Sequence, residues 1–188
     1  MARRRGRRIA LAILAICALP TAAAWFAYFI WQPQSRSNYG ELIAPRPLSD
    51  PAMELLGGGS FRLSELRGRW VMVLIGSGRC LEPCRTRLLY MRQARLAQGS
   101  NAGRIERVWI VSDSLSPGAE LRREYEGMHM VRTRQASFLA EFPAVHDPSE
   151  HIYLVDPLGN LMLRFPPDLD ARRFVKDLAR LLRASRIG

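Results

Sequence analysis

Charged residues are absent from Ile9 to Trp31, and lysine is almost absent from the whole chain, where Lys176 is the only one. Arginine therefore supplies nearly all of the positive side of the net charge of +11. Five arginines come directly before the uncharged segment: Arg3, Arg4, Arg5, Arg7 and Arg8. A basic tail can indicate a nucleic-acid partner, but its place beside a long apolar segment favours orientation in a membrane. We therefore expect no nucleic-acid partner.

The uncharged segment is 23 residues long. As a helix it would measure roughly 34 Å, enough to cross a hydrocarbon core of about 30 Å. Because arginines stay on the cytoplasmic side, we expect a cytoplasmic tail (1–8), a single transmembrane helix (9–31) in a bacterial inner membrane, and a periplasmic remainder. The alternative is a signal peptide cleaved after Ala22-Ala23-Ala24. The apolar run continues to Trp31, which a cleaved peptide would not need.

The remaining sequence predicts a spacer followed by one folded domain. Residues 32–50 contain three prolines with serine and asparagine, which is typical of an extended linker. From residue 51 to 188, apolar runs alternate with segments of helical spacing, and a hairpin and a final helix follow. The expected strands are 71–75, 108–111, 152–155 and 161–165, and the expected helices follow the cysteines, follow Ser116-Pro117 up to about Glu126, and begin near Asp170. This order predicts an α/β domain with a mixed sheet flanked by helices.

Only three cysteines are present, and Cys17 lies inside the apolar segment, which leaves Cys80 and Cys84 as the one pair available for chemistry. We expect Cys80 in the loop after a buried strand and Cys84 in the first turn of the next helix, which Glu82 and Pro83 begin. A helix N-terminus favours the thiolate, which both ligates soft metals and attacks disulfides. A disulfide across so short a loop stabilises a fold little, so a functional pair is favoured over a structural one.

The chain resembles the SCO/SenC family over residues 55–182. The similar segments are Phe61-Arg62-Leu63-Ser64-Glu65-Leu66-Arg67-Gly68-Arg69, Val73-Leu74-Ile75-Gly76 with the cysteine pair, Val111-Ser112-Asp113 with Ser116-Pro117, and Tyr153-Leu154-Val155-Asp156-Pro157-Leu158-Gly159. Members of this family are thioredoxin-like, membrane-anchored copper proteins that help to assemble cytochrome c oxidase. The resemblance implies a thioredoxin-like fold, bound copper(I), and as partner the copper-bearing oxidase subunit or another copper chaperone.

A histidine would complete the metal site that the resemblance implies. Two thiolates and one imidazole form a three-coordinate pocket suited to copper(I), whereas a closed zinc site needs a fourth ligand that is not evident. His151 begins the strand that would lie beside the cysteine loop and is the expected third ligand, with His146 as the alternative. We thus expect a membrane-tethered periplasmic copper(I) chaperone or thiol reductase with Cys80 and Cys84 as its redox pair. A thiol–disulfide oxidoreductase without metal and a non-catalytic oxidase assembly factor are the other hypotheses.

Overall fold

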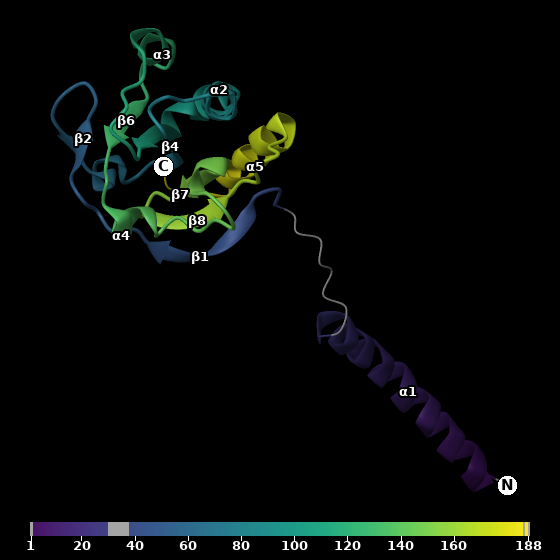
Figure 1. The fold of residues 1–188 in the computed structure, drawn as a ribbon. Coiled ribbons are helices and arrows are strands. Elements are labelled where there is room, and N and C mark those ends of the chain that lie inside the picture. Colours follow the sequence, from purple (N-terminus) through teal and green to yellow (C-terminus); the bar gives the residue numbers. More distant parts are fainter. Residues whose placement is uncertain (1, 30–37, 186, 188) are drawn as a thin grey trace. The chain divides into compact units, whose positions relative to one another are not determined.

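The computed structural model describes residues 2–29, 38–185 and 187, and the chain divides into two compact units, Met1–Ser37 and Asn38–Gly188. In the first unit, helix α1 (Ala2–Phe29) covers most of the predicted apolar segment (Figure 1). Within the described part of the chain, no helix is both long and apolar enough to cross a membrane. The predicted anchor, residues 9–31, lies partly outside the described residues, because 30–37 are not among them. It stays a prediction.

The second unit holds all of the strands that the structure describes. They are β1 (Glu41–Pro47), β2 (Met53–Leu55), β3 (Ser60–Phe61), β4 (Trp70–Gly76), β5 (Ile105–Val111), β6 (His129–Arg132), β7 (Ile152–Val155) and β8 (Asn160–Arg164). The α-helices are α2 (Glu82–Leu96), α3 (Ala119–Glu124), α4 (Ala136–Leu139) and α5 (Ala171–Ala184). Three short 3-10 helices are η1 (Leu63–Leu66), η2 (Gly99–Arg104) and η3 (Pro148–Glu150).

The strands form one mixed sheet in the order β1-β8-β7-β4-β5-β6-β2-β3. Strand β4 runs parallel to β5, β5 runs parallel to β6, and the other pairs are antiparallel. The parallel crossover from β4 to β5 contains α2, as expected for a βαβ unit. The predicted α/β domain with a mixed sheet is therefore confirmed.

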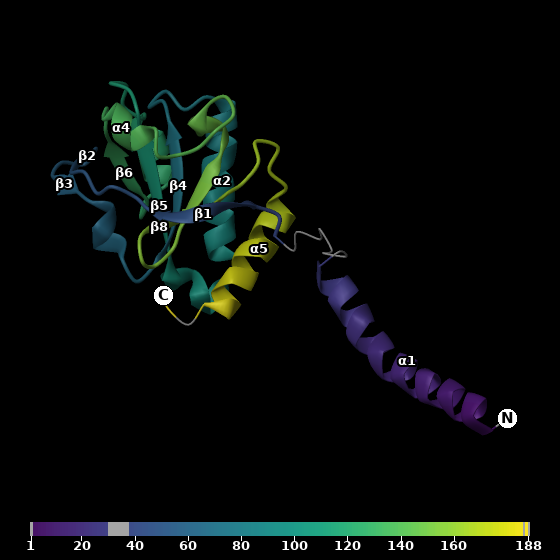
Figure 2. The ribbon, with the colours of Figure 1, turned by 90° about the horizontal axis from the view of Figure 1, so that it is seen from below.

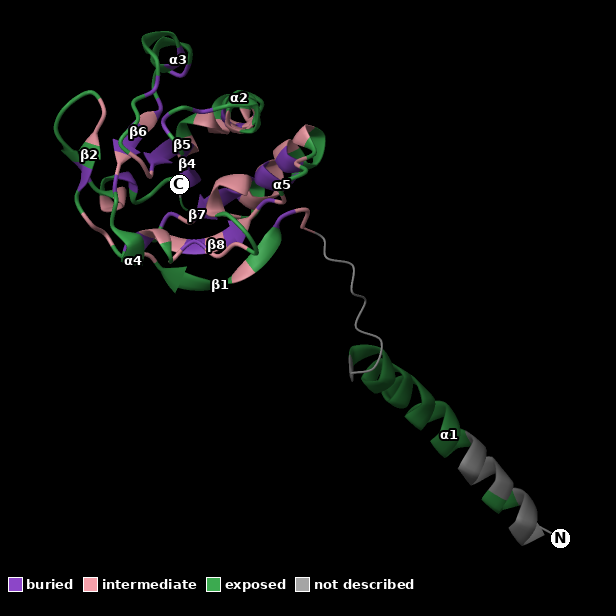
Figure 3. Ribbon diagram, in the orientation of Figure 1, coloured by how far each residue is buried: buried purple, intermediate pink, exposed green. Residues whose placement is uncertain are grey.

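Helices cover both faces of this sheet, so the central strand β4 is buried along its whole length. Trp70, Met72 and Leu74 point to the face covered by α2 and α5, whereas Val71 and Val73 belong to the core on the opposite face, where α4 lies (Figures 1 and 2). Figure 3 shows the buried residues concentrated in the strands and on the inner sides of the helices. A strand covered on both faces reads as a continuous apolar run, which is why the sequence predicted it well.

The ends of the two large helices follow from local chemistry. Helix α2 begins at Glu82 and Pro83. A proline in the first turn is favourable because the N–H that it lacks would have no partner within the helix. An acidic residue there is stabilised by the positive end of the helix dipole. Helix α5 is capped by Asp170, whose carboxylate accepts hydrogen bonds from the Arg172 and Arg173 N–H groups at 2.9 and 3.0 Å. Both starts match the predicted ones.

Two sequence-based expectations differ from the structure. The spacer expected over 32–50 contains β1, which pairs with β8 and places Leu42 opposite Leu163. Its prolines are tolerated because β1 is an edge strand, where a missing N–H costs no ladder bond. The helix expected from Ser116 begins only at Ala119. The Ser116 hydroxyl instead accepts a hydrogen bond from Arg132 at 2.9 Å, so it does not cap the helix.

Candidate functional site

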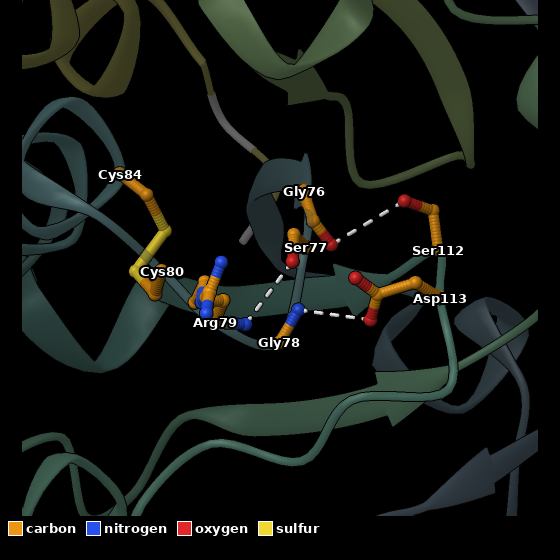
Figure 4. The surroundings of a disulfide bond; sticks show 8 residues. All are labelled: Gly76, Ser77, Gly78, Arg79, Cys80, Cys84, Ser112 and Asp113. Atoms are coloured by element: carbon orange, nitrogen blue, oxygen red, sulfur yellow. Dashed lines mark hydrogen bonds between the residues drawn. A yellow bond between two sulfur atoms is a disulfide. The ribbon is translucent and has the colours of Figure 1, made fainter.

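Cys80 and Cys84 form a disulfide where β4 passes into α2, with their Cα atoms 5.1 Å apart (Figure 4). Cys80 lies in the loop, and Cys84 is the third residue of α2. This is the placement that the sequence predicted for the pair. The structure therefore shows two sulfur atoms close enough to act together, in their oxidised form.

The backbone of Cys80 adopts an unusual conformation. Its φ of 40° lies in the left-handed region, and no other non-glycine residue in the described part of the chain has a positive φ. The N–H of Cys80 donates to the Ser77 carbonyl at 3.1 Å, which closes a tight turn. Left-handed conformations of non-glycine residues are held by their surroundings and are frequent at functional sites. The loop is thus built to hold Cys80 in one position.

The two cysteines differ in exposure. Cys80 is 2% exposed and belongs to the core on the α2 side of the sheet. Cys84 is half-buried and packs against the edge of that core. A solvent molecule or client can therefore reach the second cysteine more readily than the first.

Asp113, the second residue after β5, ties the cysteine loop to the neighbouring strand. Its carboxylate accepts a hydrogen bond from the Gly78 N–H at 3.0 Å (Figure 4). It also accepts one from the Leu115 N–H at 3.0 Å. Ser112 adds a bond from its N–H to the Gly76 carbonyl at 3.1 Å. Sequence reasoning assigned Asp113 no role in the site. The available signal was that β4 and β5 are parallel, so residues after both strands meet at one edge of the sheet.

The environment of Asp113 favours its ionised form. Burial by itself raises the pKa of this carboxyl, but hydrogen bonds from the Ser77 hydroxyl and from the Gly78 and Leu115 N–H groups, together with the positive charge of Arg132, outweigh it. The pKa of Asp113 consequently lies below its ordinary value. The carboxylate is charged at neutral pH and holds the loop as an acceptor only.

Replacing Asp113 by alanine should destabilise the domain by about 1–2 kcal/mol at pH 7, because two loop N–H groups lose their acceptor. Since the folded pKa is lowered, this contribution is present above the ordinary pKa of about 3.9 and disappears as the pH falls through the folded value. Urea unfolding of the wild type and Asp113→Ala at pH 7 and at pH 2.5 measures the difference. The gap should narrow at the lower pH, and the exposed control Asp168→Ala should show no gap at pH 7. An equal gap at both pH values would contradict this assignment.

The disulfide lines an open cavity of about 260 Å³. The lining residues are Ile75, Gly76, Ser77, Arg79, Cys80, Leu81, Pro83, Cys84, Arg87 and Ser149. Arg87 is fixed by a hydrogen bond from its Nε to the Glu150 carbonyl at 3.0 Å. Desolvation lowers the pKa of Arg87, against the opposing attraction of Glu150 and Asp147. The cavity thus combines an apolar rim with guanidinium groups beside the sulfur atoms.

The two histidines lie in a different cavity. His146 and His151 line a space of about 370 Å³ together with Tyr39, Glu41 and Arg164, among others, and neither histidine lines the cysteine cavity. His151 is 6% exposed, and its Nδ1 lies 2.8 Å from the Phe165 carbonyl, so that carbonyl fixes the ring. In the cysteine cavity, Ser149 is the residue contributed by this part of the chain.

The expected three-ligand copper site is therefore not assembled by these residues. Within the described ranges, no group of three or more His, Cys, Asp or Glu side chains could hold a metal ion. The physical reason is the turn η3, which places Ser149 at the cysteine cavity, while the Phe165 carbonyl, directly after β8, holds the His151 ring. The side chains around the disulfide therefore fit a redox-active cysteine pair better than a copper site made of two thiolates and an imidazole.

Solved structures with a similar fold identify the fold of this domain. The domain is similar to copper-bound ScoI from Arabidopsis thaliana (TM-score 0.62, 15% identity, 74% of this chain and 100% of that one). It is also similar to copper-bound yeast Sco1 (TM-score 0.62, 18% identity, 76% and 96%). A third is the thioredoxin domain of a thiol-disulfide oxidoreductase from Bacteroides vulgatus (TM-score 0.57, 19% identity, 74% and 99%). At these identities the likeness establishes the thioredoxin-like fold.

No curated protein matches this sequence. A family model described as "Transmembrane-like, thioredoxin-like, C-terminal domain" matches residues 70–185, which is more than half of the chain and includes β4, the cysteine loop and α5. The chain belongs to this transmembrane-like, thioredoxin-like C-terminal domain family.

Proposed function

We propose that this protein is a thiol–disulfide reductase that acts outside the cytoplasm through Cys80 and Cys84. The observation that carries the proposal is the disulfide itself, which spans the junction of β4 and α2 and lines an open cavity. A structural bridge would close a long loop, whereas this one closes a short one and constrains the unfolded chain little. A cysteine pair that lines an open cavity and stabilises the fold little is suited to thiol–disulfide exchange.

The reaction transfers two electrons and two protons from a dithiol to a disulfide. In the reduced protein, Cys80 and Cys84 are thiols; a client disulfide takes their two electrons and becomes two thiols, while the Cys80–Cys84 disulfide forms. An external dithiol then reduces the pair again. The N-terminus of α2 favours the thiolate that starts this exchange.

The proposed location is the periplasmic side of a bacterial inner membrane, with a single N-terminal anchor. Two features support it: the arginine-rich start before the uncharged run from Ile9 to Trp31, and the disulfide, which persists in oxidising compartments.

A second candidate function is copper(I) transfer by the same pair. The similar ScoI and Sco1 structures named above were solved with copper bound, and soft thiolates are suited to copper(I). With no histidine lining the cysteine cavity, reduced Cys80 and Cys84 would hold the ion as two ligands. The recipient would be the copper-bearing subunit of cytochrome c oxidase, or copper would be exchanged with another copper chaperone. This candidate predicts that the cysteine double variant fails to support oxidase assembly.

Two measurements on detergent-solubilised full-length protein separate these functions. The reductase should convert a peptide disulfide to thiols with dithiothreitol as electron source, and Cys80→Ser/Cys84→Ser should abolish the catalysed rate. For copper, reduced wild type should bind one equivalent of copper(I), each single cysteine variant should lose it, and His151→Ala and His146→Ala should bind as the wild type does. Absence of catalysed reduction rejects the reductase. If His151→Ala bound copper(I) tenfold or more weakly than the wild type (about 1.4 kcal/mol), His151 would be the third copper ligand after all.

A further inference from the structure

The chemistry of disulfide exchange makes the exposure of each sulfur decisive. An attacking thiolate approaches one sulfur of the bond from the side opposite the other, so the sulfur that a client can reach is the one that becomes bonded to it. Here Cys80 is 2% exposed and sits in the core, while Cys84 is half-buried at its edge. The two ends of the bond are therefore not equivalent for a client.

The loop that carries Cys80 is held in one position against the segment after β5. Gly78 approaches the backbone of Leu115 so closely that a Cβ at this position would lie 2.1 Å from the Leu115 carbonyl oxygen. Asp113 holds the same loop through the Gly78 N–H, and the Cys80 N–H bonds to Ser77. With its side chain in the core and its loop held in place, the Cys80 sulfur is the less accessible end of the bond, although both cysteines line the open cavity.

The charges around the pair also favour Cys84. It is the third residue of α2, where the partial positive charge of the helix N-terminus acts on a thiolate. The Arg79 and Arg87 side chains line the same cavity, and Arg87 is held by the Glu150 carbonyl. Glu150 and Asp147 lie near Arg87 and offset part of its charge. The helix terminus and the exposure of Cys84 point to the same sulfur.

We infer that clients form their mixed disulfide on Cys84, the second cysteine in the sequence, and that buried Cys80 is the resolving cysteine. This inference rests on the proposed reductase function. In the first step the Cys84 thiolate attacks a client disulfide; the Cys84–client S–S bond forms, the client S–S bond breaks, and one client thiolate leaves and takes a proton from water. In the second step Cys80, after losing its proton to water, attacks the Cys84 sulfur. The Cys80–Cys84 bond forms and the second client thiolate leaves.

The experiment compares two single variants of full-length protein in detergent, Cys80→Ser and Cys84→Ser, each also carrying Cys17→Ser so that the free cysteine of α1 does not react. Reduced protein is mixed with oxidised glutathione, and mass spectrometry follows the glutathione adduct. We expect Cys80→Ser, which retains Cys84, to form the adduct at least about tenfold faster than Cys84→Ser. Equal rates, or a faster reaction of Cys84→Ser, would overturn the inference.

A second measurement guards against variants that fold poorly. Oxidised Cys17→Ser protein, with the native pair intact, is treated with reduced glutathione, alkylated with N-ethylmaleimide and digested. Fragmentation of the peptide that carries both cysteines should place glutathione on Cys84 and the maleimide on Cys80; the reverse labelling refutes the assignment. If Cys84 carries the glutathione but no peptide disulfide is reduced catalytically, the reductase proposal fails while the order of reactivity stands.

Discussion

Gly78→Ala is expected to displace the cysteine loop and to destabilise the domain by about 1–3 kcal/mol, as overpacking typically does. The new Cβ would lie 2.1 Å from the Leu115 carbonyl oxygen, 2.6 Å from its carbon and 3.2 Å from the Ser116 nitrogen. All three are backbone atoms, so no side-chain rotation relieves the clash. Because buried Cys80 lies two residues further along the same loop, displacing the loop should expose its thiol and make it react faster in the reduced protein. Urea unfolding and the rate of iodoacetamide labelling at Cys80 measure the two effects.

Gly76→Ala is the matched control for this prediction. A Cβ at Gly76 would meet only the Ser149 Cβ and the Trp109 Nε1, both at 3.9 Å, which is ordinary van der Waals contact. Gly76 lines the same cavity as the cysteines. The control therefore separates the effect of the clash at Gly78 from the general effect of replacing a glycine near the cysteines by alanine. If the two variants unfold at the same urea concentration and label Cys80 at the same rate, the close packing of Gly78 against Leu115 is not what fixes the loop.

Phe174→Ala should cost about 3–5 kcal/mol of folding free energy, the range for truncating a buried aromatic side chain. Phe174 is fully buried, and its ring packs edge-on against Phe165 with centroids 4.4 Å apart. This contact joins α5 to the end of the sheet, where the Phe165 carbonyl also holds His151. Since domains of this size have a total stability of only about 5–15 kcal/mol, the variant should be close to unfolding at 37 °C.

Lys176→Ala, on the exposed side of the same helix, provides the comparison and should change stability by less than about 0.5 kcal/mol. Thermal unfolding followed by circular dichroism, with and without a reducing agent, measures both variants. A Phe174→Ala protein as stable as Lys176→Ala would show that α5 contributes little to the core.

Strand β4 and helix α2 could be predicted from the sequence because their signals are local. Seven consecutive apolar residues identify a strand covered on both faces, and an acidic residue and a proline identify the start of a helix. These two elements place Cys80 in a loop and Cys84 in a first helical turn. The edge strand β1 was missed because its prolines and its exposed residues imitate a linker, and only pairing with β8 makes it a strand.

The amino-acid sequence by itself determined the fold class, the main elements of the domain and the position of the cysteine pair, since each follows from residues near one another in the chain. The tertiary structure alone decided which side chains share the cysteine cavity. It brought Asp113 to the loop because β4 and β5 are parallel, and it placed His151 in another cavity because η3 and the Phe165 carbonyl direct its ring there. Contacts between strands depend on which strands pair, and the pairing in this sheet brings together residues that are far apart in the sequence.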